Sequence, residues 1–298
     1  MAHGLEWGDQ PDLNRPLLVA AFSGWNDAGD AATGATDWLM RHGAARRFAV
    51  IDPDEHIDYQ SSRPRVEVVE GMVRSITWPA NEYFAATFRE RDLVVLRGTE
   101  PNMGWKSFCD AVMTVASAME CEMVVTLGAL LGDVPHTRPV RVTGSTTDAD
   151  LERELDLTRS GYEGPTGIVG VLHDSCRAAG MRSASLWVPV PHYVATPPSP
   201  PATRALLEQL GVLGGFAFDF QGLDQLAELW RLQVDRAIAD NDEVTTYVRE
   251  LEARIDAEDA TERGVVLGEH PAGGGSIPSV DELADEVEQY LREQEGKG

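Results

Sequence analysis

The chain has 298 residues and a formal net charge of -24, with 49 acidic and 25 basic side chains. Nucleic-acid phosphates and anionic membrane surfaces are bound by clustered Lys and Arg, so this balance argues against both classes of partner. Residues 221–298 hold twenty acidic and seven basic side chains. This acidic region is typical of solvated helix faces, and it also fits a docking surface for a basic partner.

Cysteine usage and hydropathy indicate a cytoplasmic protein. Three cysteines without a CxxC or Cys/His pattern predict neither a disulfide framework nor a zinc site. The start of the chain has no basic segment followed by an apolar one, so we expect no signal peptide. No apolar run approaches the roughly 20 residues that span a bilayer.

Strands and helices alternate along the first 220 residues. Continuous apolar runs predict buried strands, and apolar residues three and four apart predict helices. In chain order we expect a strand at 17–23, a helix from Asp27 to Gly43, a strand at 46–52, a hairpin at 65–79, a strand at 92–98, a helix at 102–120, a strand at 121–131, a helix from Thr166 to Gly180, a strand at 183–193 and a helix from Ser199 to Gly211. This alternation predicts an α/β fold, a three-layer α/β/α sandwich with a mostly parallel central sheet.

Four segments make up the predicted domain organisation. We expect a core domain at 1–220, a C-terminal helical extension at 221–260, a flexible linker at 261–278 and an acidic C-terminal helix at 279–298. The extension carries an apolar stripe, so we expect it to pack on the core or at an oligomer interface.

Polar and aromatic residues follow four of the predicted strands. Ligands of open parallel sheets bind beyond the carboxyl ends of the strands, so these residues should gather at one edge as a pocket or an interface. The candidates are Gly24, Trp25, Asn26, Asp27, Gly98, Glu100, Trp105, Gly128, Asp133, His136, His192 and Tyr193. Two histidines near carboxylates suit acid/base chemistry, which predicts one pocket lined by Asn26, Glu100, His136 and His192.

Each of these residues also has a structural interpretation. Asp27 suits the N-terminus of a helix, the glycines supply backbone freedom, and the two histidines suit hydrogen-bonded structural positions. Gly24 and Gly29 have the spacing of a phosphate loop, but Asp30-Ala31 stands where Lys-Ser/Thr is required. GxGxxG, GxSxG and HExxH are absent. We therefore expect no cofactor and no metal, and no catalytic residue is assigned.

Five segments together resemble the proteasome assembly chaperone 2 family in its actinobacterial form. They are "AFSGWNDAGDAA", "RGTEPNMGW", "LGALLGDVPHTRPV", "GYEGPTGIVGVL" and "VPHYVATPPSP", and the resemblance runs from about residue 15 to 260. It implies a sandwich similar to nucleoside phosphorylases, an oligomer, and a role in the assembly of proteasome α-subunits. The family has no agreed catalytic residues.

The C-terminus contains a second, weaker resemblance. Gln289-Tyr290-Leu291 resembles the docking tail of bacterial proteasome activators, but seven residues follow it, so the terminal carboxylate is displaced. Tyr290 and Leu291 also suit the apolar face of the last helix.

These observations predict a non-enzymatic, protein-binding homo-oligomer, with a trimer favoured and proteasome subunits as candidate partners. The alternative is a small-molecule binding protein, or a hydrolase- or phosphorylase-like enzyme, that uses the strand-end edge.

Overall fold

The computed structural model describes residues 4–69, 73–146, 148, 151–152, 164–194 and 196–267. The chain divides into two compact units, 1–253 and 254–298, and the fold described below belongs to the first. In the second unit, residues 254–267 are helical.

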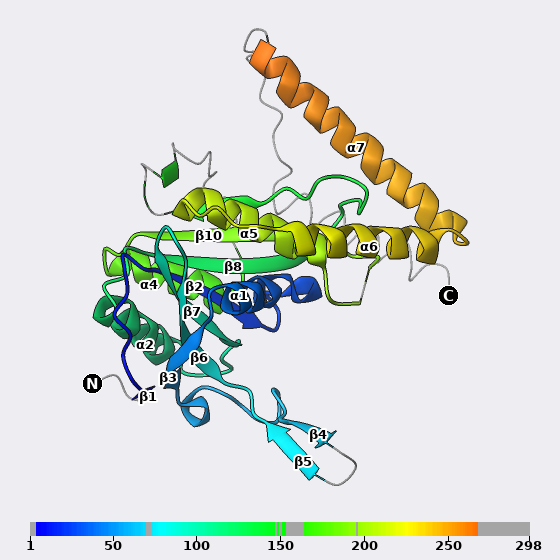
Figure 1. Cartoon of the computed structure of the whole chain (residues 1–298). Helices are drawn as coiled ribbons and strands as arrows, with labels where there is room; N and C mark the ends of the chain where they lie inside the picture. The colour runs from blue at the N-terminus through cyan, green and yellow to red at the C-terminus, as the bar shows by residue number, and fades with distance from the viewer. Residues whose placement is uncertain are drawn as a thin grey trace. The chain divides into compact units, whose positions relative to one another are not determined.

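An eight-stranded mixed sheet forms the centre of the first unit (Figure 1). Its strands are β1 (Leu5–Trp7), β2 (Leu17–Ser23), β3 (Arg46–Ile51), β6 (Asn81–Thr87), β7 (Asp92–Thr99), β8 (Met123–Gly132), β9 (Thr143–Thr146) and β10 (Ser183–Pro191). They lie in the order β1-β3-β6-β7-β2-β8-β10-β9. The four neighbours β7, β2, β8 and β10 are parallel, and the flanking strands pair antiparallel. The sheet is therefore parallel at its centre, as predicted.

Helices cover both faces of this sheet. They are α1 (Ala31–His42), α2 (Trp105–Ala118), α4 (Ile168–Ala178) and α5 (Pro200–Gly214). On one face, Leu17 and Val19 of β2 belong to the same apolar cluster as α1 and α5. On the other, Leu18 and Phe22 pack with α2 and α4. Because β2 is buried on both faces, its sequence is continuously apolar. The predicted α/β/α sandwich is confirmed.

The predicted hairpin at 65–79 is also confirmed, as a separate two-stranded sheet of β4 (Arg65–Val69) and β5 (Val73–Thr77). Figure 1 shows it extending away from the main sheet. Val66 and Ile76 face each other across the hairpin, and both are exposed. Two strands alone are marginally stable in water, so this hairpin is a poorly supported part of the fold.

Two helices follow the sandwich, α6 (Gln221–Ile238) and α7 (Asp242–Leu267). α5 continues past the predicted end at Gly211 and stops at Gly215, which adopts the left-handed conformation (φ 72°). α7 continues through Leu267, so the first seven residues of the expected linker are helical. The rest of that linker, the expected last helix and Tyr290 with Leu291 lie outside the described residues.

Within the described residues, no helix is long and apolar enough to cross a membrane. No group of three or more His, Cys, Asp or Glu side chains in the same ranges has the geometry to hold a metal ion. Cys109, Cys121 and Cys176 are free thiols in the core. Burial raises the pKa of Cys121 and Cys176 to about 12, so these thiols stay protonated at neutral pH.

Candidate functional site

The four predicted loops do lie at one edge of the sheet, because they follow the four parallel strands. The loops after β2 and β7 are neighbours, and those after β8 and β10 are neighbours in turn. The strand order separates the candidate residues into two groups. The first follows β2 and β7, and the second follows β8 and β10.

Asp27 holds the beginning of α1. A short 3-10 turn (Ala28–Asp30) separates it from the helix, and its carboxylate reaches over that turn. Oδ1 accepts hydrogen bonds from the amides of Ala32 (2.7 Å) and Thr33 (3.2 Å), and Oδ2 accepts one from the Thr33 hydroxyl. Two of the helix's otherwise unpaired N–H groups are thereby satisfied. Burial raises the pKa of the Asp27 carboxyl above its ordinary value.

Glu100 holds the beginning of α4 in a similar way. Its Oε1 accepts hydrogen bonds from Asn26 Nδ2 (2.9 Å) and from the backbone N–H of Ile168 (3.0 Å). Gly167 permits this approach, because a Cβ on it would lie 2.3 Å from Asn26 Nδ2 and 2.7 Å from Glu100 Oε1. Asn26 is almost fully buried, and its backbone carbonyl accepts the N–H of Ala129 in β8. The Glu100 carboxylate thus connects the ends of β2 and β7 to the beginning of α4.

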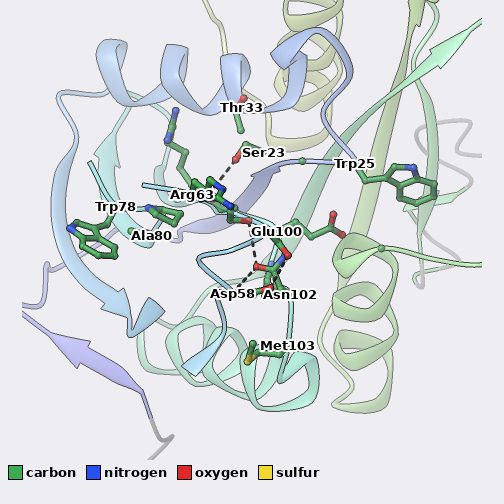
Figure 2. A pocket seen from close by; sticks show the side chains of 18 of the residues that line it. Ser23, Trp25, Thr33, Asp58, Arg63, Trp78, Ala80, Glu100, Asn102 and Met103 are labelled. Carbon is green, nitrogen blue, oxygen red and sulfur yellow. Dashed lines mark hydrogen bonds between the residues drawn. The ribbon is translucent and has the colours of Figure 1, made fainter. Parts of the chain in front are cut away.

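A pocket of about 1250 Å³ opens in front of Glu100, between the ends of β2 and β7 and the base of the β4–β5 hairpin (Figure 2). We call it the strand-end pocket. Its lining includes Ser23, Arg63, Arg65, Trp78, Asn102 and Met103. Trp78 is 53% exposed and packs edge-to-face on Tyr59 at 4.9 Å between ring centroids. The pocket lining thus combines aromatic side chains with four carboxylates, from Asp30, Asp58, Glu82 and Glu100, and three guanidinium groups, from Arg63, Arg65 and Arg97.

Most charged groups around the strand-end pocket are already engaged. Glu82 accepts a hydrogen bond from Arg47 (2.6 Å), and Arg97 donates one to Asp37 (2.5 Å). Asp58 accepts the backbone N–H of Gln60 and the Ser61 hydroxyl, which lower the pKa of its carboxyl. Asp30 also lines the pocket and is exposed.

By contrast, Arg63 and Arg65 make no ion pair with any described residue. Both are exposed. Pro64 lies between them and favours extended backbone before it, and residues two apart in an extended segment face the same side. The Arg-Pro-Arg sequence therefore places two guanidinium groups on the pocket wall, and Arg63 is seen there in Figure 2.

His136 lies in the second group, under α6. Its side chain is fully buried, with Nε2 3.0 Å from Asp235 of α6 and Nδ1 2.8 Å from the Tyr193 hydroxyl. The same hydroxyl accepts the backbone N–H of His136 (2.8 Å), and burial raises the pKa of Tyr193 to about 12. A Tyr193 O–H that donates to Nδ1 requires the proton on Nε2, which then donates to Asp235. This chain of bonds connects the loop after β8 to α6.

His192 lies beside that chain, on the surface. Its Nδ1 is 3.0 Å from Asp133, and both side chains are largely exposed. Its ring contacts Tyr247 of α7 edge-to-face at 5.4 Å between centroids. His192 and Tyr193 also line a shallower groove of about 670 Å³ with residues 242–250 of α7.

The structure therefore brings only some of the sequence-predicted residues together. Gly24, Trp25, Glu100 and Trp105 line the strand-end pocket. Asn26 and Asp27 are buried behind it, Gly98 packs on Asn81, Gly128 packs on the Trp187 ring, and Asp133, His136, His192 and Tyr193 form the second group. The expected pocket that would contain Asn26, Glu100 and both histidines is not formed, because His136 is covered by α6.

The chain resembles known proteins over most of its length. The PAC2 family model matches residues 21–238. No functionally curated protein matches. A PAC2 family protein from Streptomyces avermitilis is 47% identical, with a TM-score of 0.73 over 78% of this chain and 99% of the other. A proteasome-assembly chaperone homologue from Mycobacterium tuberculosis is 41% identical, with a TM-score of 0.72 over 78% of this chain and 99% of its own.

A more distant structure shares the fold alone. An archaeal proteasome activator from Pyrococcus furiosus is 18% identical, with a TM-score of 0.64 over 78% of this chain and 97% of the activator. The family model spans more than half of the chain, and the two actinobacterial structures are matched over almost their whole length. The chain belongs to the PAC2 family.

Proposed function

We propose that this chain is a non-enzymatic homo-oligomer that binds protein partners, with proteasome subunits as the partners to test first. The helical extension, residues 221–260, supplies part of its interface. A trimer remains the predicted state.

The observation that carries this proposal is the outer face of α6. Leu223 and Trp230 of this helix are buried against the core, as an amphipathic helix requires. Leu226, Leu229 and Leu232 are 54%, 56% and 37% exposed. Three leucines spaced three apart form a second apolar stripe, and exposed apolar stripes of this kind mark protein–protein contacts.

The engagement of the strand-end residues supports a non-enzymatic role. The Asp27 carboxylate accepts three hydrogen bonds at the start of α1, and Glu100 holds the start of α4. His136 is saturated between Tyr193 and Asp235. Catalysis needs such a group within reach of a substrate; of these three only Glu100 lines the strand-end pocket, where it holds the start of α4.

The suggested partner comes from a relative. The Mycobacterium tuberculosis protein, 41% identical, is described as a proteasome-assembly chaperone homologue. The chain's net charge of -24 favours a partner with a basic docking surface, because complementary charge accelerates association.

The enzyme alternative has one supporting observation, the strand-end pocket with its polar lining. The two histidines do not support it, because neither lines that pocket. A screen of small anions and nucleosides by thermal shift tests it directly. A compound that raises the Tm of the wild type, but not that of a Trp78→Ala variant, would favour it.

The proposed function is tested by co-expression with proteasome α- and β-subunits from the same genome. We expect the chain to co-purify with α-subunits and to raise the fraction of assembled rings. Leu226→Glu with Leu229→Glu should abolish co-purification or lower the oligomer mass in light scattering. A wild-type monomer that neither binds α-subunits nor changes their assembly would refute the proposal.

A further inference from the structure

A second cavity lies where α7 begins. It is the groove of about 670 Å³ that His192 and Tyr193 form with residues 242–250, and we call it the α7 groove. It shares no lining residue with the strand-end pocket. The rings of His192, Tyr193 and Tyr247 contact one another edge-to-face, at 5.4 to 6.2 Å between centroids. The α7 groove therefore has an aromatic wall that contacts within the chain hold in place.

The charges in the lining of the α7 groove are of one sign. Asp242, Glu243 and Glu250 line it and are exposed, and the lining contains no Lys or Arg. None of the three carboxylates forms an ion pair with another described residue. The His192 imidazole lies 3.0 Å from Asp133, so a proton on this ring is balanced by that carboxylate. The α7 groove thus differs from the strand-end pocket, where four carboxylates face three guanidinium groups.

The helical repeat places these carboxylates around one ring. Glu243, Tyr247 and Glu250 are four and three residues apart, so they lie on one face of α7. The helix dipole favours acidic residues in the first turn, which accounts for Asp242 and Glu243. Glu250 lies two turns further on, where the dipole gives no such advantage. Arg249 does not compensate it in the groove, because adjacent residues of a helix do not face each other and Arg249 is not part of the lining.

Aromatic rings beside unpaired carboxylates recognise organic cations. A Lys ammonium or an Arg guanidinium is attracted by the face of an aromatic ring, and it forms a charge-assisted hydrogen bond with a carboxylate. An anion would meet three like charges in this groove. The volume of about 670 Å³ falls within the roughly 300–1,000 Å³ of typical ligand sites, which is room for more than one side chain. The lining therefore suits a short segment with basic side chains.

We propose that the α7 groove binds a Lys- or Arg-bearing segment of a partner protein, whose cations lie against Tyr247 and pair with Glu243 and Glu250. This inference rests on the proposed protein-binding function, and it names the surface that docks and the chemistry of the segment it takes. The α7 groove belongs to the same helical extension as the exposed leucines of α6. A partner surface with apolar residues beside basic ones would match both.

A second copy of this chain is a poor source of such a segment. The chain carries 49 acidic and 25 basic side chains, so two copies repel each other at long range. A partner with a basic surface is instead attracted to the extension, and complementary charge accelerates their association.

Binding of short charged peptides to the full-length chain tests the groove. The probes are fluorescein-labelled tetralysine and tetraarginine, with tetraglutamate as the control of opposite charge, and fluorescence anisotropy measures their affinity. We expect both cationic peptides to bind, tetraglutamate not to bind, and the affinity to fall as salt is raised. The groove variant, Asp242→Asn with Glu243→Gln and Glu250→Gln, should bind tetralysine about tenfold more weakly, because it loses three exposed ion pairs.

A chain with a large negative charge attracts basic peptides in general, so the control must match the charge. Asp110→Asn with Glu90→Gln and Glu120→Gln removes three exposed carboxylates outside the groove. This control should keep the wild-type affinity within about twofold, since salt screens distant charges. Tyr247→Leu keeps the charge and removes the ring, so it should weaken binding, whereas Tyr247→Phe keeps the ring and should bind as the wild type does.

A single substitution separates the groove from the stability of α7. Asp242 and Glu243 also support the first turn of the helix, so the groove variant changes two things at once. Glu250→Gln lies outside that turn. We expect it to weaken tetralysine binding while the circular dichroism spectrum stays that of the wild type.

The outcomes distinguish this inference from the proposed function. If tetralysine binds no better than tetraglutamate, or if the groove variant and the charge-matched control bind it equally, the inference is wrong. It is also wrong if the groove variant, but not the control, has a lower oligomer mass in light scattering, because the occupant is then a second copy. A chain that co-purifies with proteasome α-subunits but fails the peptide test keeps the proposed function and loses the inference. A chain that passes the peptide test but is a monomer without α-subunits loses the proposed function and keeps the groove.

Discussion

Gly167→Ala tests whether Glu100 is an anchor for α4. Gly167 has φ −91°, a value open to any residue, so the substitution acts through space and not through backbone strain. The added Cβ would lie 2.3 Å from Asn26 Nδ2 and 2.7 Å from Glu100 Oε1. Neither distance is tolerable, so at least one side chain must move and the bonds from Asn26 and Ile168 to Glu100 are strained or broken.

Two contributions set the size of the effect. Overpacking of a well-packed site costs about 1–3 kcal/mol. A hydrogen bond to a charged group contributes about 1.5–3 kcal/mol, and the substitution endangers two of them. Because the neighbouring side chains relax and the carboxylate is only partly buried, these contributions do not add fully. We expect a loss of about 2–4 kcal/mol in the free energy of unfolding.

Urea unfolding followed by tryptophan fluorescence measures this loss, and hydrogen exchange shows where it acts. The amides of Ile168 and Val169 should exchange faster in Gly167→Ala than in the wild type. Gly222→Ala is the matched control, because no atom lies within 4 Å of its Cβ position and alanine favours the helix. If Gly167→Ala unfolds within about 0.5 kcal/mol of the wild type, a value typical of neutral surface substitutions, the anchor interpretation of Glu100 is wrong.

Three further predictions concern neighbouring positions. Burial raises the pKa of the Asp27 carboxyl above its ordinary value of 3.8, so folding favours its protonated form. The stability of the wild type relative to Asp27→Asn should therefore be greatest below pH 3.8 and fall as pH rises through the raised pKa, which urea titrations measure. Tyr193→Phe removes the acceptor of the His136 amide and should lower stability by about 1–3 kcal/mol, with faster exchange of that amide; an unchanged exchange rate would argue against the bond. Gly98→Ala places a Cβ 1.9 Å from the Asn81 side chain and 2.8 Å from a backbone oxygen. We therefore expect thermal unfolding to show a larger loss of stability for Gly98→Ala than for Gly167→Ala. An equal or smaller loss of stability would contradict this comparison.

The central strands were predictable because their environment is uniform. β2, β7 and β8 are covered on both faces, so each reads as a continuous apolar run. The strands β1 and β9 span three and four residues, and β6 begins at a polar residue after a hairpin. Such edge and flanking strands are specified by the backbone groups of their neighbours, which local sequence does not encode.

The candidate site was only partly predictable for a related reason. Strand order places Trp25 and Glu100 together, which the rule for parallel sheets predicts. It does not reveal that His136 meets Asp235, 99 residues away, because the position of α6 depends on packing of the whole core. The Arg63-Pro64-Arg65 segment carried a usable signal, since its two-residue period places both cations on one side.

The polar residues at the strand-end edge of this fold hold helices in place. In open α/β sheets the loops at this edge are free to bind ligands because the sheet already supplies stability. Here the edge must also hold α1, α4 and α6, and Asp27, Glu100 and His136 each anchor one of these helices. These hydrogen bonds connect the strand ends to the three helices within the chain itself. The strand-end pocket lies in front of Glu100, and its lining also includes Asp30, Arg63, Arg65 and the exposed Trp78.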